Sequence, residues 1–386
     1  MIDPADTALG EGPPVTATPP ARQRVDRLIG PDVTRGVALI GVVVMNYHGY
    51  LNGSTASAGP DATWAQSLFD PWKGVLATRF AATFVTVAGV GITLLTRRGV
   101  ASGDRTAISA DRWRLVRRGV LLYLFGLILN WIWSGTILFF YGAFFVIGAL
   151  LFTLRSRTVL TIGAVAAVVA AAIRWWAAVR IEDGHSVAWL LSPGTFATRS
   201  PRGLLFDTFL NGTHPVLPWL AFLCVGIVLG RHLTDLPRRA LVIAGVSLTA
   251  LTYAINHLVL TNTDGAVART VASTRYGDRG VLYTLGTVGT SVVAYCVITW
   301  LAERFSATWP VTALAAAGRT TLSLYVVHVL VFRLLVDTWH VVGGTGLDTA
   351  LVFALAFWVF AILVASWWQR FIGQGPLERL YRKFGG

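Results

Sequence analysis

The segment from Asp32 to His48 places an acid, an arginine, an amide and an imidazole in one apolar stretch. Asp32 and Arg35 are three residues apart, so on a helix they share a face, can form an ion pair, and leave Arg35 able to bind a phosphate. His48 lies about 20 Å further along, because each helical residue adds about 1.5 Å. An imidazole is a natural general base near neutral pH, and Asn46 can orient an acceptor or donate to a developing oxyanion.

A structural interpretation of the same two residues stays open beside the chemical one. His48 is then an interfacial side chain that reaches water, and Asn46 is a hydrogen-bonding contact between helices. Spacing along one helix does not separate the two interpretations. We therefore treat Asn46 and His48 as candidate catalytic residues that need the positions of their neighbours.

A second candidate base is His214, which lies just before an apolar run that contains Pro215 and Pro218. The prolines leave backbone groups without helical partners, and such backbone at membrane depth lines a pocket or is buried in protein. The alternative is a proline-stiffened helix start with a solvated histidine. Trp219 follows on the same segment and, with Arg79 near the outer end of another apolar run, is a candidate substrate-binding residue.

A third histidine, His328, lies in the middle of an apolar run, ten residues after Gly318 and three after Tyr325. Residues three apart share a helical face, so Tyr325 and His328 are expected to act together. A buried polar group at that depth needs a partner. We expect both to bind substrate or support the site, with plain helix packing as the alternative.

Arginines gather at the ends of the apolar runs and are candidates for binding a nucleotide-like cofactor through its phosphates. The densest group extends from Arg97 to Arg118. Lipid headgroups and topology alone also explain such a group. The candidate cofactor-binding residues are Asp32, Arg35, Arg117, Arg118 and Arg319. The sequence contains no Walker loop, no nucleophile elbow and no His or Cys metal pattern, so no metal is expected.

The composition points to a membrane as the solvent of this chain. Of its 386 residues 54% are hydrophobic and 13% are charged, and the mean hydropathy is +0.62. These values exclude an ordinary water-soluble domain. The formal net charge is +13, and its arginines lie mostly at the ends of apolar runs, which fits the positive-inside rule and excludes a nucleic-acid partner. Cys224 and Cys296 lie inside apolar runs and are expected to be buried thiols.

Ten apolar runs are long enough to cross about 30 Å of hydrocarbon. We predict an all-α polytopic membrane protein with about ten transmembrane helices and both termini in the cytoplasm, because this orientation places most arginines inside. Residues 1–24 are expected to form a disordered cytoplasmic tail, and residues 25–383 a single transmembrane domain. The predicted spans are 33–51, 74–96, 115–133, 137–154, 158–178, 214–230, 239–260, 280–301, 313–336 and 347–371.

Several of these motifs together resemble one known family. They are Asp32 to Gly36 through Asn46 and Tyr47, Phe84 to Gly91, His214 to Trp219 through Gly230 and Arg231, Gly318 and Arg319 through His328, and Gly375 to Arg379. This combination resembles the transmembrane acyltransferase superfamily, in particular the heparan-alpha-glucosaminide N-acetyltransferase-like branch and its bacterial DUF418 and YeiB-type relatives. The resemblance covers about residues 25–383.

The resemblance implies an enzyme that moves an acyl group, expected to be acetyl, from cytosolic acyl-CoA to an extracytoplasmic glycan or glycolipid. It aligns Asn46 with a family asparagine near the active site. The lysosomal relative has its catalytic histidine where this chain has residues 54–59, which include no histidine. We therefore rank His48 first and His214 second as the base.

The expected partners are the bilayer of the plasma membrane, acyl-CoA and the acceptor, with a homodimer left open. The alternative function is a transporter or flippase of a lipid-linked or sugar substrate, whose path the same buried polar groups would line.

Overall fold

A computed structural model describes residues 28–191, 200–233, 235 and 237–386 of the chain. The expected tail at 1–24 lies outside these ranges. The described part is helical and has no strand in it, which confirms the all-α prediction. The longer helices are α1 (Ile29–Asn52), α3 (Arg79–Ser102), α4 (Arg105–Ile132), α5 (Leu138–Leu151), α6 (Ser156–Glu182), α9 (Val216–Arg231), α10 (Arg238–Asn262), α12 (Val281–Arg304), α13 (Trp309–Arg319), α14 (Thr321–Phe332) and α15 (Leu347–Phe371).

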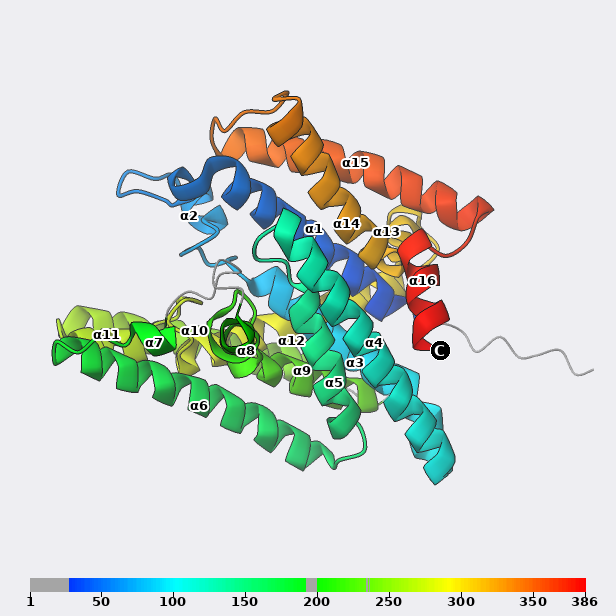
Figure 1. Ribbon diagram of the computed structural model, residues 1–386, viewed down its shortest axis with the longest axis horizontal. Coiled ribbons are helices and arrows are strands. Elements are labelled where there is room, and N and C mark those ends of the chain that lie inside the picture. Colours follow the sequence, from blue (N-terminus) through cyan, green and yellow to red (C-terminus); the bar gives the residue numbers. More distant parts are fainter. Residues whose placement is uncertain (1–27, 192–199, 234, 236) are drawn as a thin grey trace, which may run out of the picture.

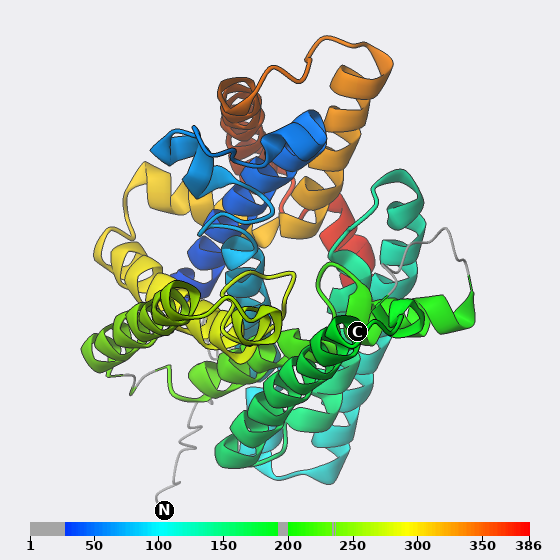
Figure 2. The ribbon, with the colours of Figure 1, turned by 90° about the vertical axis from the view of Figure 1, so that its left-hand side faces the viewer.

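Shorter elements connect or flank these helices. They are a 3-10 turn (Gly53–Ala56), α2 (Trp64–Phe69), α7 (Ala188–Leu191), α8 (Pro201–Phe206), a π-helical turn (Asp207–Asn211), α11 (Ala266–Val271), a second π-helical turn (Arg333–Thr338) and α16 (Pro376–Gly385). In Figure 1 α2, α7 and α11 lie at one end of the bundle and α16 at the other. We call the first the loop end and the second, where Arg97, Arg98, Arg118 and Arg319 lie, the basic end. Figure 2 is a view onto the loop end.

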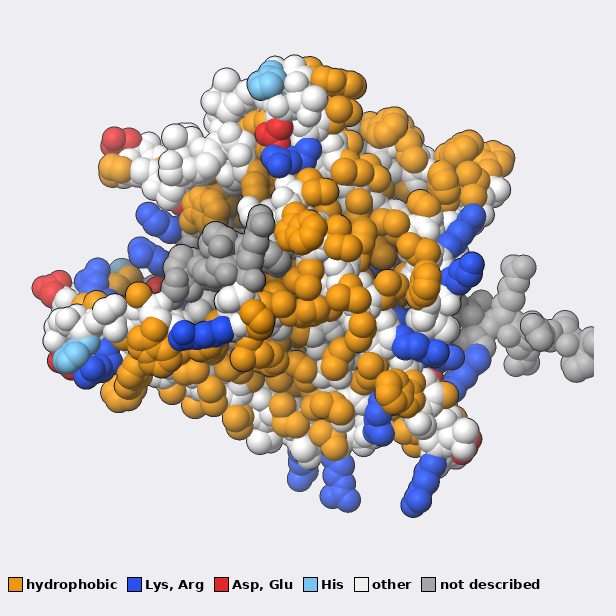
Figure 3. Space-filling model, in the orientation of Figure 1, with side chains coloured by type: hydrophobic (Ala, Val, Ile, Leu, Met, Phe, Trp, Pro, Cys, Tyr) orange, Lys and Arg blue, Asp and Glu red, His pale blue; other side chains and the backbone are white. Residues whose placement is uncertain are grey.

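Eight of the described helices are long and apolar enough to cross a membrane, and nine are if the bent segment Pro201–Arg231, with its 53° break, counts as one span. The surface also fits a membrane-spanning bundle. In Figure 3 hydrophobic groups cover the middle of the surface, and Lys and Arg gather near its edges. The protein is therefore a multi-pass membrane protein. The predicted count of ten is not confirmed, because the run at 137–154 forms the 14-residue helix α5, shorter than the about 20 residues a span needs.

One predicted span is broken. The run 313–336 was expected to be a single helix, but α13 ends at Arg319 and α14 begins at Thr321. The new helix start needs acceptors for its first N–H groups. Glu378 of α16 supplies them, because its Oε1 accepts from the backbone N–H of Leu322 at 2.7 Å and of Ser323 at 3.1 Å. A carboxylate from a distant helix thus stabilises the break.

Helix α1 lies in the middle of the bundle and contacts α3, α12, α13, α14 and α15. Glycines allow several helices of the bundle to approach one another closely. A Cβ atom on Gly318 would lie 1.7 Å from the carbonyl oxygen of Asp32, and one on Gly226 of α9 would lie 1.9 Å from that of Thr86 in α3. These backbones are in direct contact, as is common where small residues pack membrane helices.

Replacing Gly226 by alanine is therefore expected to destabilise the protein by about 1–3 kcal/mol, because α3 and α9 must separate to admit the methyl group. Thermal unfolding in detergent measures this loss. Gly277→Ala is the matched control, since a Cβ there meets nothing within 4 Å. Equal melting temperatures for the two variants would contradict the close packing.

Candidate functional site

A cavity of about 580 Å³ lies between α1, α3, α4, α5, α13, α14 and α16. This volume is in the range of small-molecule and cofactor sites. Its basic end is lined by Arg35, Arg97, Arg98, Arg118, Arg319 and Arg382, with Asp32, Glu378 and Tyr381 among them. Its other end is lined mostly by apolar and aromatic side chains, which include Phe84, Ile137, Leu138, Tyr141, Phe145 and Tyr325. We call this space the donor cavity.

The six arginines of the donor cavity come from five helices, since only Arg97 and Arg98 share one. Arg35 is held by its expected partner, with Nη1 at 3.5 Å from Oδ1 of Asp32. Arg118 donates to the carbonyl of Gly386 and lies over the ring of Tyr381, 5.2 Å from its centroid. The Nε of Arg319 donates to Gln369 at 2.6 Å. Several guanidinium groups around one mouth create a strongly positive potential that attracts a polyanion.

Four of the five predicted cofactor-binding residues line this cavity: Asp32, Arg35, Arg118 and Arg319. The fifth, Arg117, is exposed and does not line the cavity, although its side chain, like that of Arg118, lies close to Gly386. Helical geometry explains the difference, because consecutive residues point about 100° apart. Arg97, Arg98 and Arg382 also line the cavity. The sequence analysis left the group from Arg97 to Arg118 open between phosphate binding and topology, and did not name these three among the candidate cofactor-binding residues.

The floor of the donor cavity is built on the turn between α4 and α5. The hydroxyl of Tyr325 contacts Thr136 Oγ1 and accepts from the backbone N–H of Ile137, both at 3.1 Å. The ring of Tyr325 packs against His328, with centroids 4.8 Å apart. The predicted association of Tyr325 with His328 is therefore observed. Tyr325 lines the cavity, whereas His328 is fully buried behind it.

Asn46 faces the same side of α1 as Arg35, because eleven residues make slightly more than three helical turns. Its Nδ2 lies 3.4 Å from Nε2 of His328, and the neighbouring Tyr47 donates from its hydroxyl to the carbonyl of His328 at 3.0 Å. Asn46 and His328 therefore form a polar contact behind the floor of the donor cavity. Neither of them lines the cavity itself.

His48 lies on the other side of α1, about 160° around the axis from Asn46. It is 3% exposed, and its Nδ1 is 2.9 Å from the carbonyl oxygen of Phe69. A carbonyl only accepts, so Nδ1 carries the proton and Nε2 keeps the free lone pair. The tautomer suits a base, but the side chain faces Phe69, the last residue of α2, and does not line the donor cavity.

His214 lies at the loop end, on the far side of the α4–α5 turn from the donor cavity. Its Nδ1 is 2.8 Å from Thr213 Oγ1, which donates to the carbonyl of Gly135 in that turn. Its ring packs edge-on against Trp219, with centroids 4.6 Å apart. The residues Gly135 to Ile137 therefore separate His214 from Tyr325.

The predicted substrate residue Arg79 is found in a different place, at the start of α3. Its guanidinium lies over the ring of Tyr283, 5.4 Å from the centroid, and donates to the hydroxyl of Tyr253 at 3.3 Å. Trp219 is 1% exposed and packs against His214 and Phe222. The structure thus brings Trp219 to His214 but leaves both residues outside the donor cavity.

Tyr141 is a cavity residue that the sequence analysis did not single out. Tyr141 of α5 lines the apolar part of the donor cavity, and its buried hydroxyl has no hydrogen-bond partner in the described structure. A buried tyrosine hydroxyl usually has a partner. The sequence did contain a signal for Tyr141, because a polar residue in an apolar span is a candidate site residue, and Tyr141 and Thr153 are the only polar side chains of the predicted span 137–154.

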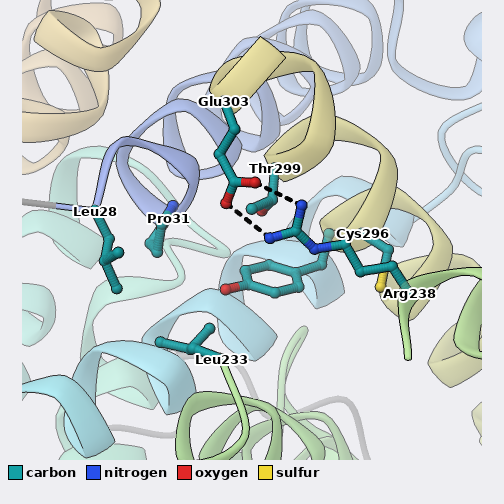
Figure 4. A pocket seen from close by; sticks show the side chains of 8 residues that line it. Leu28, Pro31, Leu233, Arg238, Cys296, Thr299 and Glu303 are labelled. Atoms are coloured by element: carbon teal, nitrogen blue, oxygen red, sulfur yellow. Dashed lines mark hydrogen bonds and ion pairs between the residues drawn. The ribbon is translucent and has the colours of Figure 1, made fainter. Parts of the chain in front are cut away.

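A second, much smaller cavity lies at the basic end between α1, α10 and α12. It measures about 30 Å³, which admits one or two water molecules. Figure 4 shows Arg238 and Glu303 beside it, joined by two hydrogen bonds of 2.5 and 2.8 Å. This space is too small for a substrate, so the donor cavity is the better candidate site.

Two family models match the sequence. The model described as Heparan-alpha-glucosaminide N-acetyltransferase, catalytic, matches residues 27–259, more than half of the chain. The chain belongs to that family. The model described as Protein of unknown function (DUF418) matches residues 231–385, so the resemblance inferred from the motifs is confirmed. A search of curated proteins finds no match.

The donor cavity is shared between the two matched regions. Arg35, Arg118 and Tyr141 lie in the part that matches the N-acetyltransferase family, whereas Arg319 and Tyr325 lie in the part that matches DUF418. The family membership makes the protein an acetyltransferase-like membrane protein. No group of three or more His, Cys, Asp or Glu able to hold a metal occurs among the described residues.

Two tyrosines of the donor cavity form a matched pair for a stability test. Tyr325→Phe is expected to destabilise the protein by about 1–3 kcal/mol, because it leaves the buried N–H of Ile137 without its acceptor. Tyr141→Phe is expected to be neutral or stabilising, because it removes a buried hydroxyl that has no partner. Thermal unfolding of both variants checks this. A larger loss for Tyr141→Phe than for Tyr325→Phe would contradict the hydrogen bonds described above.

Proposed function

We propose that this protein is a membrane acetyltransferase that takes an acetyl group from cytosolic acetyl-CoA and transfers it to a glycan or glycolipid at the outer face. The observation that carries the proposal is the donor cavity, whose mouth is basic and whose floor is apolar. That polarity matches acyl-CoA, which has a phosphate-rich nucleotide at one end and an acyl thioester at the other. In this proposal the basic end and both termini lie in the cytoplasm, and the membrane is the plasma membrane.

The arginines of the mouth bind the phosphates of the donor. Arg35, Arg118 and Arg319 come from three helices and point into one cavity, so they can contact phosphates that lie several ångströms apart. The pantetheine arm then extends along the apolar wall. This places the thioester beside Tyr141 and Tyr325 at the floor.

The unpartnered hydroxyl of Tyr141 is suited to donate a hydrogen bond to the thioester carbonyl. Such a donor stabilises the oxyanion that forms when the acceptor attacks. The hydroxyl of Tyr325 is already used in the floor and keeps the α4–α5 turn in place. Asn46 and His328 support Tyr325 from behind through their own contact.

The reaction needs one base. The acceptor nitrogen or oxygen forms a bond to the carbonyl carbon, the bond from carbon to sulfur breaks, and the acceptor's proton passes through the base to the departing thiolate. Of the two ranked histidines, His214 is favoured by its place across the α4–α5 turn from the cavity floor. His48 has a suitable tautomer but lies on the opposite side of α1 from Arg35.

Binding of acetyl-CoA to the purified protein tests the donor site. Acetyl-CoA is expected to raise the melting temperature, because a ligand that binds only the folded state stabilises it. Arg118→Gln is expected to weaken the binding about 10- to 150-fold through loss of one charged contact to phosphate, which is worth about 1.5–3 kcal/mol. Arg117→Gln is the matched control, because Arg117 is exposed and does not line the cavity. No stabilisation of the unaltered protein by acetyl-CoA would overturn the proposal and favour a transporter or a scaffold.

Separate replacement of the two histidines tests the base. His214→Gln is expected to lower acetyl transfer in membranes about 100-fold or more, which is the usual contribution of a general base. His48→Gln is expected to retain most of the activity and to lose stability, because it alters a buried hydrogen bond to the carbonyl of Phe69. If both variants keep full activity, neither histidine is the base.

A further inference from the structure

Helix α16 has an exposed face that the donor cavity does not use. Leu380 and Phe384 are four residues apart and therefore share one side of the helix, and they are 48% and 58% exposed. Arg379 and Lys383 are also four apart and exposed, and they form a row next to this apolar pair. The outward face of α16 is thus apolar along one side and basic along the other.

The opposite side of α16 faces the protein. Glu378, the only acidic residue in the sequence of this helix, accepts from the backbone N–H groups of Leu322 and Ser323. Tyr381 lies under the guanidinium of Arg118, and both Glu378 and Tyr381 line the donor cavity. The negative charge of α16 is therefore used inside the protein, and the charges on its outward face are positive.

The segment before α16 sets the level of this helix. Helix α15 is long and apolar enough to cross a membrane and ends at Phe371, which is exposed together with Trp367. Exposed aromatic side chains at the end of a span lie at the level of the headgroups. The link from Phe371 to Pro376 is short, and the Nε1 of Trp368 donates back to the carbonyl of Gln374 at 3.0 Å. Helix α16 therefore begins beside the headgroups.

The direction of α16 fits this position. In Figure 1 it lies across the basic end, at a steep angle to α15. Lys and Arg side chains gather at the same edge of the molecule in Figure 3. A helix that lies in the plane of the interface places its apolar side chains among the acyl chains and its basic ones among the headgroups. Basic side chains at that level attract anionic lipids.

We infer that α16 is a membrane-surface helix that binds anionic phospholipids, with Leu380 and Phe384 among the acyl chains and Arg379 and Lys383 at the phosphates. Because the other face of α16 forms part of the mouth of the donor cavity, the lipid also holds that mouth in place. Lipid is favoured over a protein partner because the exposed face of α16 continues the exposed aromatic end of α15. The inference does not rest on the proposed function.

Hydrogen exchange of the full chain in nanodiscs tests the inference. Discs of phosphatidylcholine alone are compared with discs that also contain phosphatidylglycerol. Two regions are followed: the amides of α16, and those of Leu322 and Ser323, which donate to Glu378. Both are expected to exchange more slowly in the anionic discs, by up to about 25-fold if each of the two basic side chains contributes about fivefold. Inorganic phosphate added to the neutral discs is expected to change neither region.

Variants of α16 locate the lipid contact. The double variant Arg379→Gln, Lys383→Gln is expected to lose the dependence on phosphatidylglycerol. The matched control is Arg155→Gln, Arg157→Gln, which removes two exposed arginines at the start of α6 that do not line the donor cavity, and it is expected to keep the dependence. Because Arg379 also donates to the carbonyl of Ile372, Lys383→Gln alone decides the matter if the double variant does not fold. It is expected to reduce the slowing about fivefold.

Each outcome has a distinct meaning. Slower exchange of both regions in the anionic discs, abolished by the double variant, supports the inference. Equal exchange in the two kinds of disc, or slowing that survives in the double variant, overturns it and leaves the face to a protein partner. Slowing by inorganic phosphate alone also overturns it, because a lipid surface is then not needed. Slowing in α16 without slowing at Leu322 and Ser323 overturns the hold on the mouth. Acetyl-CoA is absent throughout, so failure of this inference is distinct from failure of the acetyltransferase proposal.

Discussion

The constraint on which the site depends is the need of each backbone N–H group inside an apolar bundle to find an acceptor. Between α13 and α14 the helix is interrupted, and the first N–H groups of the new helix have no acceptor within it. Glu378 accepts from two of them and also accepts a hydrogen bond from the Ser323 hydroxyl at 2.5 Å. This one carboxylate fixes where α14 starts.

The position of α16 follows from the same contact. Because Glu378 belongs to α16, that helix is held over the basic end, where Tyr381 and Arg382 join the arginines of α1, α3, α4 and α13. In the other direction α14 carries Tyr325 to the α4–α5 turn. The mouth and the floor of the donor cavity are therefore both positioned by the interruption at Thr320.

Much of the fold could be predicted from the sequence, because an apolar run long enough to cross a membrane has few alternatives to a helix. The ion pair of Asp32 with Arg35, and the contact of Tyr325 with His328, followed from spacing on a single helix. The 100° rotation per helical residue also predicts that His48 lies on the side of α1 opposite to Arg35 and Asn46.

The remaining features depend on contacts between residues distant in sequence. No proline marks the helix break at Thr320 in the sequence. Glu378, whose carboxylate accepts from the N–H groups after the break, is more than 50 residues away. The approach of Arg279 to the π-helical turn at Asp207, and of Arg79 to Tyr283, also joins segments that no local pattern connects. Length alone did not reveal that α5 would be short, since its apolar run continues into the turn that follows.

The hydrogen bonds of Tyr325 have a consequence for the cell as well as for the reaction. They join α14 to the α4–α5 turn in the middle of the bundle, with Trp133 packed behind against His328 at 5.8 Å between ring centroids. A water-filled passage at this level would dissipate the proton gradient and the electrical potential of the membrane. The buried rings of Trp133, Tyr325 and His328 restrict such a passage. In the proposed reaction only the acetyl group has to pass the α4–α5 turn, so the bilayer can remain an insulator while the enzyme works on both of its sides.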